Sequence, residues 1–418
     1  MAAPLTKIRR APLLDSEKTN GARTRLERTE NADMTGIIKE RLFTPGPTPL
    51  LLEAQLRALT VTLHHRTDAF RTLMRETLDN LKYYFNTRND VILFASSGTG
   101  AMEGAISNLL SPGDRVLIGT AGKFGERWVQ LAKAYGIESV VVEAPYGHAV
   151  PIGEMKKHLE TGGPFGAVFI QATESSTGVR NDVEALGKIV SALPECCLVV
   201  DAITGLGTTE LHPDEWGIDI MIGGSQKATM IPPGLAFASV SEKAWKAIEK
   251  AKLPRYYFDY AKERKSLSKG ESSYTPATSL VVSLHGALNY IKQLGLENLI
   301  ANAALLAAAT REAAAALGLT HFAVSSPANA VTAINAPAGI ESTKVVKEMR
   351  SRFGVILTDG QGTMKGHMFR LAHLGYYDFL DLMAVLGALE IALLKVGHKV
   401  ELGGGVRAAQ NVYLRHSS

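Results

Sequence analysis

The chain has 418 residues, 46% of them hydrophobic and 21% charged, with 45 Lys and Arg against 41 Asp and Glu. This composition is typical of a globular protein, and the length predicts two or three structural units. Residues 1–41 hold nine basic and six acidic side chains, so the remaining chain is nearly neutral, which argues against a broad nucleic-acid-binding surface. No uninterrupted apolar run reaches the roughly 18 residues that a membrane span needs, so we expect no membrane partner.

The two cysteines, Cys196 and Cys197, are adjacent. Neighbouring side chains of a strand point to opposite faces, so we expect no disulfide between them, and there is no CxxC motif for a metal. The cysteine usage therefore predicts no metal site and a cytoplasmic location.

Both ends of the chain are weakly patterned. Residues 1–40 are polar, and we expect them to be a disordered extension, within which Met34 is a hypothetical alternative start of translation. Residues 401–418 are Gly-rich and then polar, and we expect a flexible tail.

From residue 90 the chain alternates short apolar runs with amphipathic stretches. The apolar runs are 91–94, 115–118, 138–143, 166–170, 197–201, 218–222 and 235–240. The amphipathic stretches are 99–110, 124–135, 153–160, 182–192 and 241–251. This alternation predicts an α/β fold, with a mostly parallel sheet covered by helices on both faces.

After residue 252 the pattern changes to two long helical stretches followed by short strands and helices. We therefore predict a large domain at 41–290 and a smaller α+β domain at 291–400. The first segment, 41–60, contains a turn-rich Pro-Gly-Pro stretch and could pack on the smaller domain.

A lysine follows the apolar run 218–222, in Gly223-Gly224-Ser225-Gln226-Lys227. A lysine that leaves a buried strand for a small-residue pocket is partly desolvated, which favours the neutral amine that can attack a carbonyl. Asp201 ends the preceding apolar run, where a carboxylate needs a cationic partner. The pair is consistent with pyridoxal 5'-phosphate (PLP) held as a Schiff base on Lys227. Taken singly, Lys227 is more often an ordinary loop lysine, and Asp201 could equally be a structural cap.

Other segments offer groups that such a cofactor needs. Ser96–Met102 opens a predicted helix, and its small residues leave N–H groups free for a phosphate, or simply cap the helix. Phe124 lies between glycines, where its ring could stack on a flat cofactor or pack in the core. The Ser175 hydroxyl could bond a cofactor oxygen or cap a turn. Arg370, in an apolar strand, suits bidentate carboxylate binding or a structural ion pair.

Taken together, these residues resemble the class V aminotransferases of the fold-type I PLP superfamily, and within them the alanine–glyoxylate, serine–glyoxylate and serine–pyruvate branch. The likeness runs from Thr44 to about residue 398. The segments that carry it are Thr44–Pro49, Ser97–Glu103, Gly122–Trp128, Glu174–Val179, Asp201–Ala202, Gly224–Lys227, Pro232–Leu235 and Phe369–Leu371.

The resemblance implies a role for each candidate residue. Lys227 would hold the cofactor and then shuttle a proton, and Asp201 would pair with the pyridine nitrogen. Phe124 would stack on the ring, Ser175 would lie near its hydroxyl, and Arg370 would bind the substrate α-carboxylate. The residues that would hold the phosphate are Ser97, Gly98, Thr99 and Gln226.

The resemblance also implies a homodimer with the active site at the interface. Thr275 would reach the phosphate of the partner subunit. Some family members add a tyrosine three residues earlier, where this chain has Ser272, so we do not expect that second contact.

The implied function is ping-pong transfer of the amino group of alanine or serine to glyoxylate or pyruvate. One alternative is a class V aminotransferase with aspartate or a broad range of donors.

A PLP-dependent lyase or desulfurase is disfavoured because both cysteines lie at the start of a predicted buried strand. A non-catalytic PLP-fold protein has no need of the Lys227, Asp201 and Arg370 set. A nucleotide-binding oxidoreductase is disfavoured by the GxGxxxG spacing of 98–104.

Overall fold

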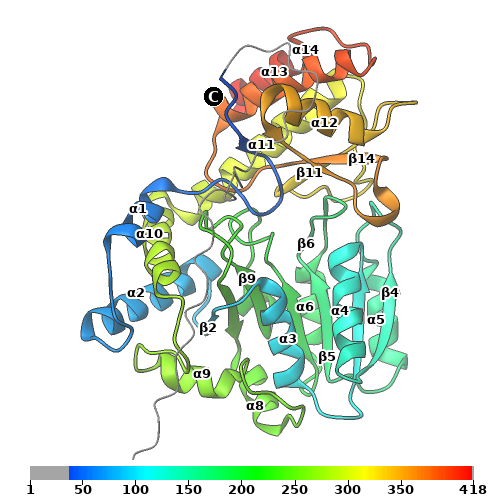
Figure 1. The fold of residues 1–418 in the computed structure, drawn as a ribbon. Helices are drawn as coiled ribbons and strands as arrows, with labels where there is room; N and C mark the ends of the chain where they lie inside the picture. The colour runs from blue at the N-terminus through cyan, green and yellow to red at the C-terminus, as the bar shows by residue number, and fades with distance from the viewer. Residues whose placement is uncertain (1–36, 417–418) are drawn as a thin grey trace, which may run out of the picture. The chain divides into compact units, whose positions relative to one another are not determined.

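The computed structural model describes residues 37–416. The predictions for residues 1–36, including the hypothetical start at Met34, lie outside this range. From Lys39 on, the described residues form one compact unit, which contains a seven-stranded main sheet and a three-stranded C-terminal sheet (Figure 1).

The main sheet confirms the predicted α/β fold, since each predicted apolar run forms one of its strands. Its strand order is β2 (Asp90–Phe94), β10 (Ala236–Val240), β9 (Ile220–Gly224), β8 (Cys197–Asp201), β5 (Ala167–Gln171), β3 (Arg115–Thr120) and β4 (Glu138–Glu143). Strand β10 runs antiparallel to the other six strands, which are parallel to one another. The central strands β8, β9 and β5 are buried along their whole length, as expected for a sheet covered on both faces.

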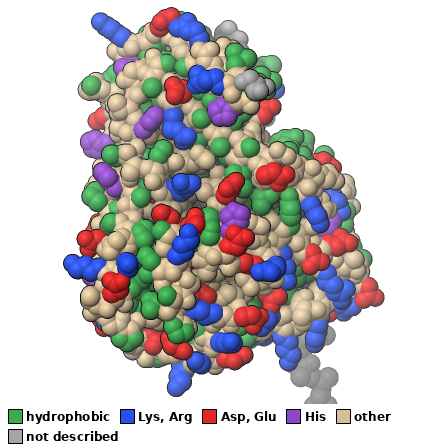
Figure 2. Space-filling model, turned by 180° about the vertical axis from the view of Figure 1, so that it is seen from behind, with side chains coloured by type: hydrophobic (Ala, Val, Ile, Leu, Met, Phe, Trp, Pro, Cys, Tyr) green, Lys and Arg blue, Asp and Glu red, His purple; other side chains and the backbone are tan. Residues whose placement is uncertain are grey.

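The helices of this part pack on the main sheet and on one another. They are α1 (Leu52–Thr60), α2 (Asp68–Phe85), α3 (Gly98–Leu109), α4 (Lys123–Ala134), α5 (Ile152–Thr161), α6 (Val183–Val190), α7 (Pro213–Trp216), α8 (Glu242–Lys250), α9 (Tyr260–Leu267) and α10 (Thr278–Leu294). Side-chain caps fix several starts, such as Ser241, which accepts a hydrogen bond from Ala244 N at 3.0 Å. Figure 2 shows acidic and basic side chains interspersed over the face drawn there.

The C-terminal sheet is antiparallel, with β14 (Met368–Ala372) between β11 (Val331–Asn335) and β13 (Thr358–Asp359). The helices packed around it are α11 (Leu296–Ala316), α12 (Ser342–Phe353), α13 (Phe379–Lys395) and α14 (Gly404–His416). They share a second hydrophobic cluster, separate from that of the main sheet. Helix α11 has the length and hydropathy of a membrane span, and 44% of its apolar window is buried in the protein, with Leu306 and Ala313 packed in this cluster.

The expectation of a flexible tail over 401–418 is wrong for residues 404–416, which form α14. Ala409 and Val412 are buried against the C-terminal cluster. The Glu390 carboxylate accepts hydrogen bonds from Gly405 N and Val406 N and so caps the helix start. The run of glycines at 403–405 hid this helix, because its cap comes from a residue far away in the sequence.

The segment 41–49 joins the two sheets. Its first residues form β1 (Arg41–Leu42), which pairs in parallel with β12 (Val355–Ile356) beside the C-terminal sheet. Further along, Thr48 Oγ1 donates to the Lys227 carbonyl at 2.9 Å. The segment therefore lies against Lys227, the candidate cofactor lysine. The division into domains at 41–290 and 291–400 stays a proposal.

Candidate active site

The predicted site residues follow strands that end at the same edge of the main sheet. Asp201 is the last residue of β8, and Lys227 comes three residues after the end of β9. The two strands are parallel neighbours, with Asp201 opposite Ile222. Ser97 follows β2 and caps α3. Because ligands of such sheets bind beyond the carboxyl ends of the strands, this edge is the candidate active site.

Lys227 is buried, with 8% of its surface exposed. Its Nζ donates a hydrogen bond to the Pro45 carbonyl. Burial lowers the lysine pKa to about 8; the negative charge of Asp201 opposes this shift, and the positive charges of Arg370 and Arg127 add to it. With a pKa of about 8, roughly one tenth of Lys227 is neutral amine at pH 7, far more than for an ordinary lysine, and the neutral amine is the form that attacks a carbonyl or takes a proton.

Gly46 leaves the space that this lysine occupies. It has a φ of +144°, and a Cβ added there would overlap the end of the Lys227 side chain. A residue with a side chain at position 46 would thus be strained in its backbone and would displace the amine.

Asp201 is also buried, and its Oδ1 accepts a hydrogen bond from Ile203 N at 2.9 Å. Burial raises the carboxyl pKa to about 6, against the hydrogen bond from Ile203 and the positive charges of Lys227 and Arg127. The negative charge of Asp201 is therefore only partly balanced by the groups around it. A bound cation, such as a protonated ring nitrogen, would stabilise it.

The four residues predicted to hold the phosphate lie together. Ser97 is the N-cap of α3 but forms no side-chain capping bond, so the first N–H groups of the helix remain available to an anion. Gly224 faces both the Gln226 amide oxygen and the Gly98 Cα. That amide oxygen is buried without a partner in the described residues, and Thr99 Oγ1 accepts a hydrogen bond from Arg127.

Phe124 is held by a carboxylate to which the sequence assigned no role. Glu174 is fully buried and its Oε2 accepts hydrogen bonds from Phe124 N and Gly125 N, both at 3.0 Å. Its Oε1 accepts from Ser176 N and Oγ. Burial raises the pKa of Glu174 despite these bonds. Glu174 therefore fixes the start of α4, and with it the position of the Phe124 ring.

Arg370 is 2% exposed and reaches the site from β14. Its Nη1 and Nη2 donate to the carbonyls of Ser175 and Asp359, both at 3.0 Å, while its buried Nε finds no partner in the part of the chain that the structure describes. Burial lowers the guanidinium pKa to about 10, against the negative charges of Glu174 and Asp359. The guanidinium is rigidly held with hydrogen-bonding capacity to spare, as a carboxylate-binding arginine requires. Ser175 is thereby placed beside Arg370; the role of its hydroxyl stays a prediction.

Thr275 does not join this cluster within the single chain. It is exposed, between α9 and α10. The predicted contact with the phosphate of a partner subunit therefore stays a prediction.

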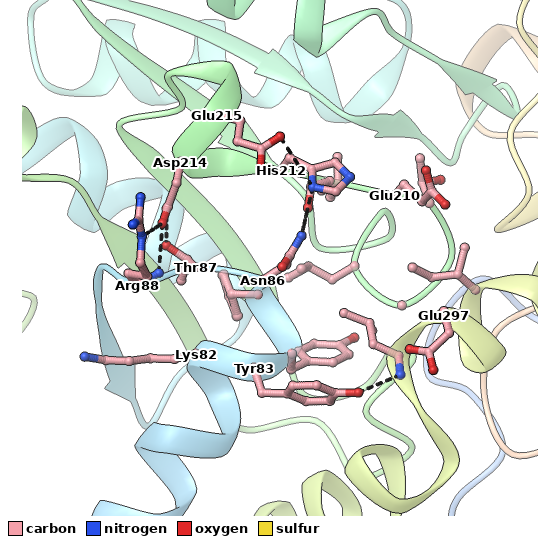
Figure 3. A pocket seen from close by; sticks show the side chains of 18 residues that line it. Lys82, Tyr83, Asn86, Thr87, Arg88, Glu210, His212, Asp214, Glu215 and Glu297 are labelled. Atoms are coloured by element: carbon pink, nitrogen blue, oxygen red, sulfur yellow. Dashed lines mark hydrogen bonds and ion pairs between the residues drawn. The ribbon is translucent and has the colours of Figure 1, made fainter.

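A cavity of about 730 Å³ lies elsewhere, between the end of α2, the loop after β8 and the start of α11 (Figure 3). Figure 3 shows Asp214 bonded to Thr87 and Arg88, and Asn86 bonded to His212. None of the predicted site residues lines this cavity. It is therefore not the place where the chemistry of Lys227 occurs.

The site as built fits PLP. A buried low-pKa amine can bond its aldehyde carbon, and a carboxylate of raised pKa can pair with its ring nitrogen. The free N–H groups at the start of α3 can take its phosphate.

Comparison with known proteins agrees with this chemistry. The model of the family "Aminotransferase class-V" matches residues 53–377. The chain belongs to the class V aminotransferases. Family membership implies PLP as the cofactor and an amino acid and a 2-oxo acid as substrates.

Relatives of this class V aminotransferase carry different names. The chain is 40% identical to the soluble hydrogenase 42 kDa subunit of Anabaena cylindrica, over 90% of this chain and 99% of that one. It is 34% identical to the L-aspartate–glyoxylate aminotransferase of Paracoccus denitrificans, over 89% and 96%. The crystal structure of alanine–glyoxylate aminotransferase from Nostoc sp. superposes with a TM-score of 0.81 at 28% identity, covering 86% of this chain and 97% of that one.

Sequence reasoning missed three contributors to the site: the Pro45 carbonyl, Glu174 and Arg127. Each lies inside a segment that carried the family resemblance, but its role depends on contacts across the fold. For Arg127, the sequence did offer a signal. It lies three residues after Phe124 on the same predicted helix, and residues three apart share a helix face.

Proposed function

We propose that this class V aminotransferase moves the amino group of alanine or serine to glyoxylate or pyruvate by a ping-pong mechanism. The observation that carries the proposal is that buried Lys227 and Asp201 meet at one edge of the main sheet and that buried Arg370 reaches them from β14 of the C-terminal sheet. Their pKa values are about 8, 6 and 10. A lysine of lowered pKa suits proton transfer near neutral pH, and a buried carboxylate of raised pKa suits a cationic ring nitrogen.

PLP, when bound, supplies an aldehyde that exchanges amines and a ring that withdraws electrons. In the proposed mechanism Lys227 holds the cofactor at rest and, once displaced by an amino acid, takes the Cα proton on its neutral Nζ. The same Nζ then returns a proton, and the Pro45 carbonyl accepts a hydrogen bond from it. Asp201 stabilises positive charge on the ring nitrogen, and Phe124 provides a flat surface on α4.

The preference for a small, singly charged acid rests on the number of free guanidinium groups. Two arginines act electrostatically on Lys227, namely Arg370 and Arg127. Arg127 lies beside Thr99 of the predicted phosphate site and over the Phe124 ring, away from the place of Arg370, which leaves Arg370 for one substrate carboxylate. A donor with a second carboxylate, such as aspartate, would need a further cation. Two of the relatives named above act on glyoxylate, which supports a small acceptor.

A desulfurase is disfavoured by the cysteines. Cys196 and Cys197 are buried at the start of β8, and burial raises the pKa of each thiol to about 12. A thiol that must accept sulfur has to reach the substrate as a thiolate, whereas these two lie at the opposite end of the strand from Asp201.

The assembly and the location of the protein are part of the proposal. We propose a homodimer in which Thr275 of each chain completes the phosphate site of the other, acting in the cytoplasm. Size-exclusion chromatography with light scattering, at several protein concentrations, measures the first point directly.

The donor and acceptor are tested by half-reactions. PLP-loaded protein is mixed with alanine, serine, aspartate or glutamate, and the loss of the cofactor absorbance is followed. Its recovery is then measured with glyoxylate, pyruvate or oxoglutarate. We expect fast conversion by alanine or serine and fast recovery by glyoxylate or pyruvate. Fast conversion by aspartate or glutamate alone would contradict the proposed donors.

A further inference from the structure

We propose that Arg127 supplies the positive charge that binds the cofactor phosphate. This inference rests on the proposed function and assigns a residue that neither the motifs nor the family match singles out. It concerns α4, whose first turn carries Phe124 and whose second turn brings Arg127 to the start of α3.

The phosphate site as predicted contains no cation. Ser97, Gly98, Thr99 and Gln226 are all neutral, and a phosphate near neutral pH carries between one and two negative charges. Lys227 is committed to the aldehyde carbon. Arg370 is tied to the carbonyls of Ser175 and Asp359 and serves the substrate. A helix start contributes only about half a charge, so an anion there gains much from a nearby guanidinium.

Arg127 is placed to provide that charge. Its Nη1 donates to Thr99 Oγ1 at 3.2 Å, which puts the guanidinium at the rim of the phosphate site. Its Cζ lies 4.9 Å from the centre of the Phe124 ring, so the ring also orients it. The positive charge of Arg127 lowers the pKa of both Asp201 and Lys227, so the guanidinium is close enough to act on the site.

The charge of Arg127 also has no ion-pair partner within residues 37–416. The neighbouring carboxylate Glu126 is paired with Lys123 at 2.8 Å instead. A half-buried guanidinium with only a hydroxyl and a ring as partners retains N–H groups for an anion.

Two other roles would use the same geometry. Arg127 could act only by holding the Phe124 ring, or it could bind a second carboxylate of the substrate. These roles predict different ligand dependence. A phosphate contact affects PLP but not pyridoxal, which lacks the phosphate, whereas a ring-holding role affects both aldehydes alike.

The experiment compares the binding of PLP and pyridoxal to cofactor-free protein, followed by absorbance and by tryptophan fluorescence. The variants are Arg127→Gln and Arg127→Lys. Lys123→Gln is the matched control, because it removes a cation from the same helix that pairs with Glu126 rather than with Thr99. Inorganic phosphate is added as a competitor in a second series.

For Arg127→Gln we expect the Kd of PLP to rise about 10- to 100-fold, the range for lost hydrogen bonds to a charged group, with the Kd of pyridoxal unchanged. Arg127→Lys should recover part of the loss, and Lys123→Gln should leave both constants unchanged. Inorganic phosphate should compete with PLP in the wild type and much less in Arg127→Gln.

Equal weakening of PLP and pyridoxal in Arg127→Gln, or no weakening of either, would overturn the inference while leaving the proposed function intact. Unchanged pyridoxal binding also shows that the variant is folded. A wild-type protein that binds neither aldehyde at Lys227 would instead refute the proposed function, and the role of Arg127 with it.

Discussion

Replacing Asp201 by Asn should make the cofactor-free protein more stable while abolishing its activity. Asp201 is 5% exposed, and burial raises its pKa from 3.8 to about 6. Asn has nearly the same shape, can still accept the hydrogen bond from Ile203 N, and carries no charge. The variant thus removes the buried charge and keeps the packing.

The expected gain follows from the pKa difference. A shift of about 2.2 units, at about 1.4 kcal/mol per unit, corresponds to about 3 kcal/mol of unfavourable free energy at neutral pH. Because the folded-state pKa is raised, the folded protein binds more protons than the unfolded chain between pH 3.8 and about 6. The cost of Asp201 is therefore absent below pH 3.8, grows as the pH rises, and is complete above about 6. We expect a gain of about 1–3 kcal/mol for the variant at neutral pH.

Urea unfolding of the cofactor-free proteins, at pH values of about 7.5, 6 and 4.5, measures this difference. Asp219→Asn is the matched control, since Asp219 is buried at the other end of the same strands. Its carboxylate accepts from Leu198 N and Ser241 Oγ and pairs with Lys243 at 3.2 Å. That variant should be destabilised. An Asp201→Asn protein that is less stable than the wild type, or whose gain does not shrink at low pH, would refute the reasoning.

Two further predictions concern single residues. The rate at which cofactor-free protein reacts with pyridoxal should rise about tenfold per pH unit up to a pH near 8 and then level off, because burial lowers the pKa of Lys227 to about 8. An ordinary lysine has a pKa of about 10, so a rate that still climbs steeply above about pH 9–10 would contradict this prediction. Arg370→Lys keeps a charge but cannot satisfy both the Ser175 and Asp359 carbonyls, so kcat/KM should fall at least about 100-fold. The affinity of Arg370→Lys for PLP should hardly change. Steady-state kinetics together with a cofactor titration would show whether the fall in kcat/KM comes from weaker substrate binding.

The sequence predicted the main sheet well because each strand is a short apolar run between helices. The uninterrupted runs at 197–201 and 218–222 mark strands buried on both faces, and both are found as β8 and β9. The positions of Asp201 and Lys227 follow directly, since both leave the carboxyl ends of neighbouring parallel strands.

What the sequence could not predict depends on contacts between distant segments. Helix α14 begins at glycines and is capped by Glu390, so no local signal marks it. The Pro45 carbonyl approaches Lys227 only because segment 41–49 crosses between the two sheets. Arg127 meets Thr99 only once α3 and α4 are packed side by side.

The most direct test of the central claim is to find where the cofactor is bound. PLP-loaded protein is reduced with borohydride and digested, and the labelled peptide is identified by mass spectrometry. A single pyridoxyl label on Lys227, lost in Lys227→Ala and released by alanine or serine before reduction, is the predicted result. A label on another lysine, or a Lys227→Ala protein that still retains reducible covalent cofactor, would contradict the account.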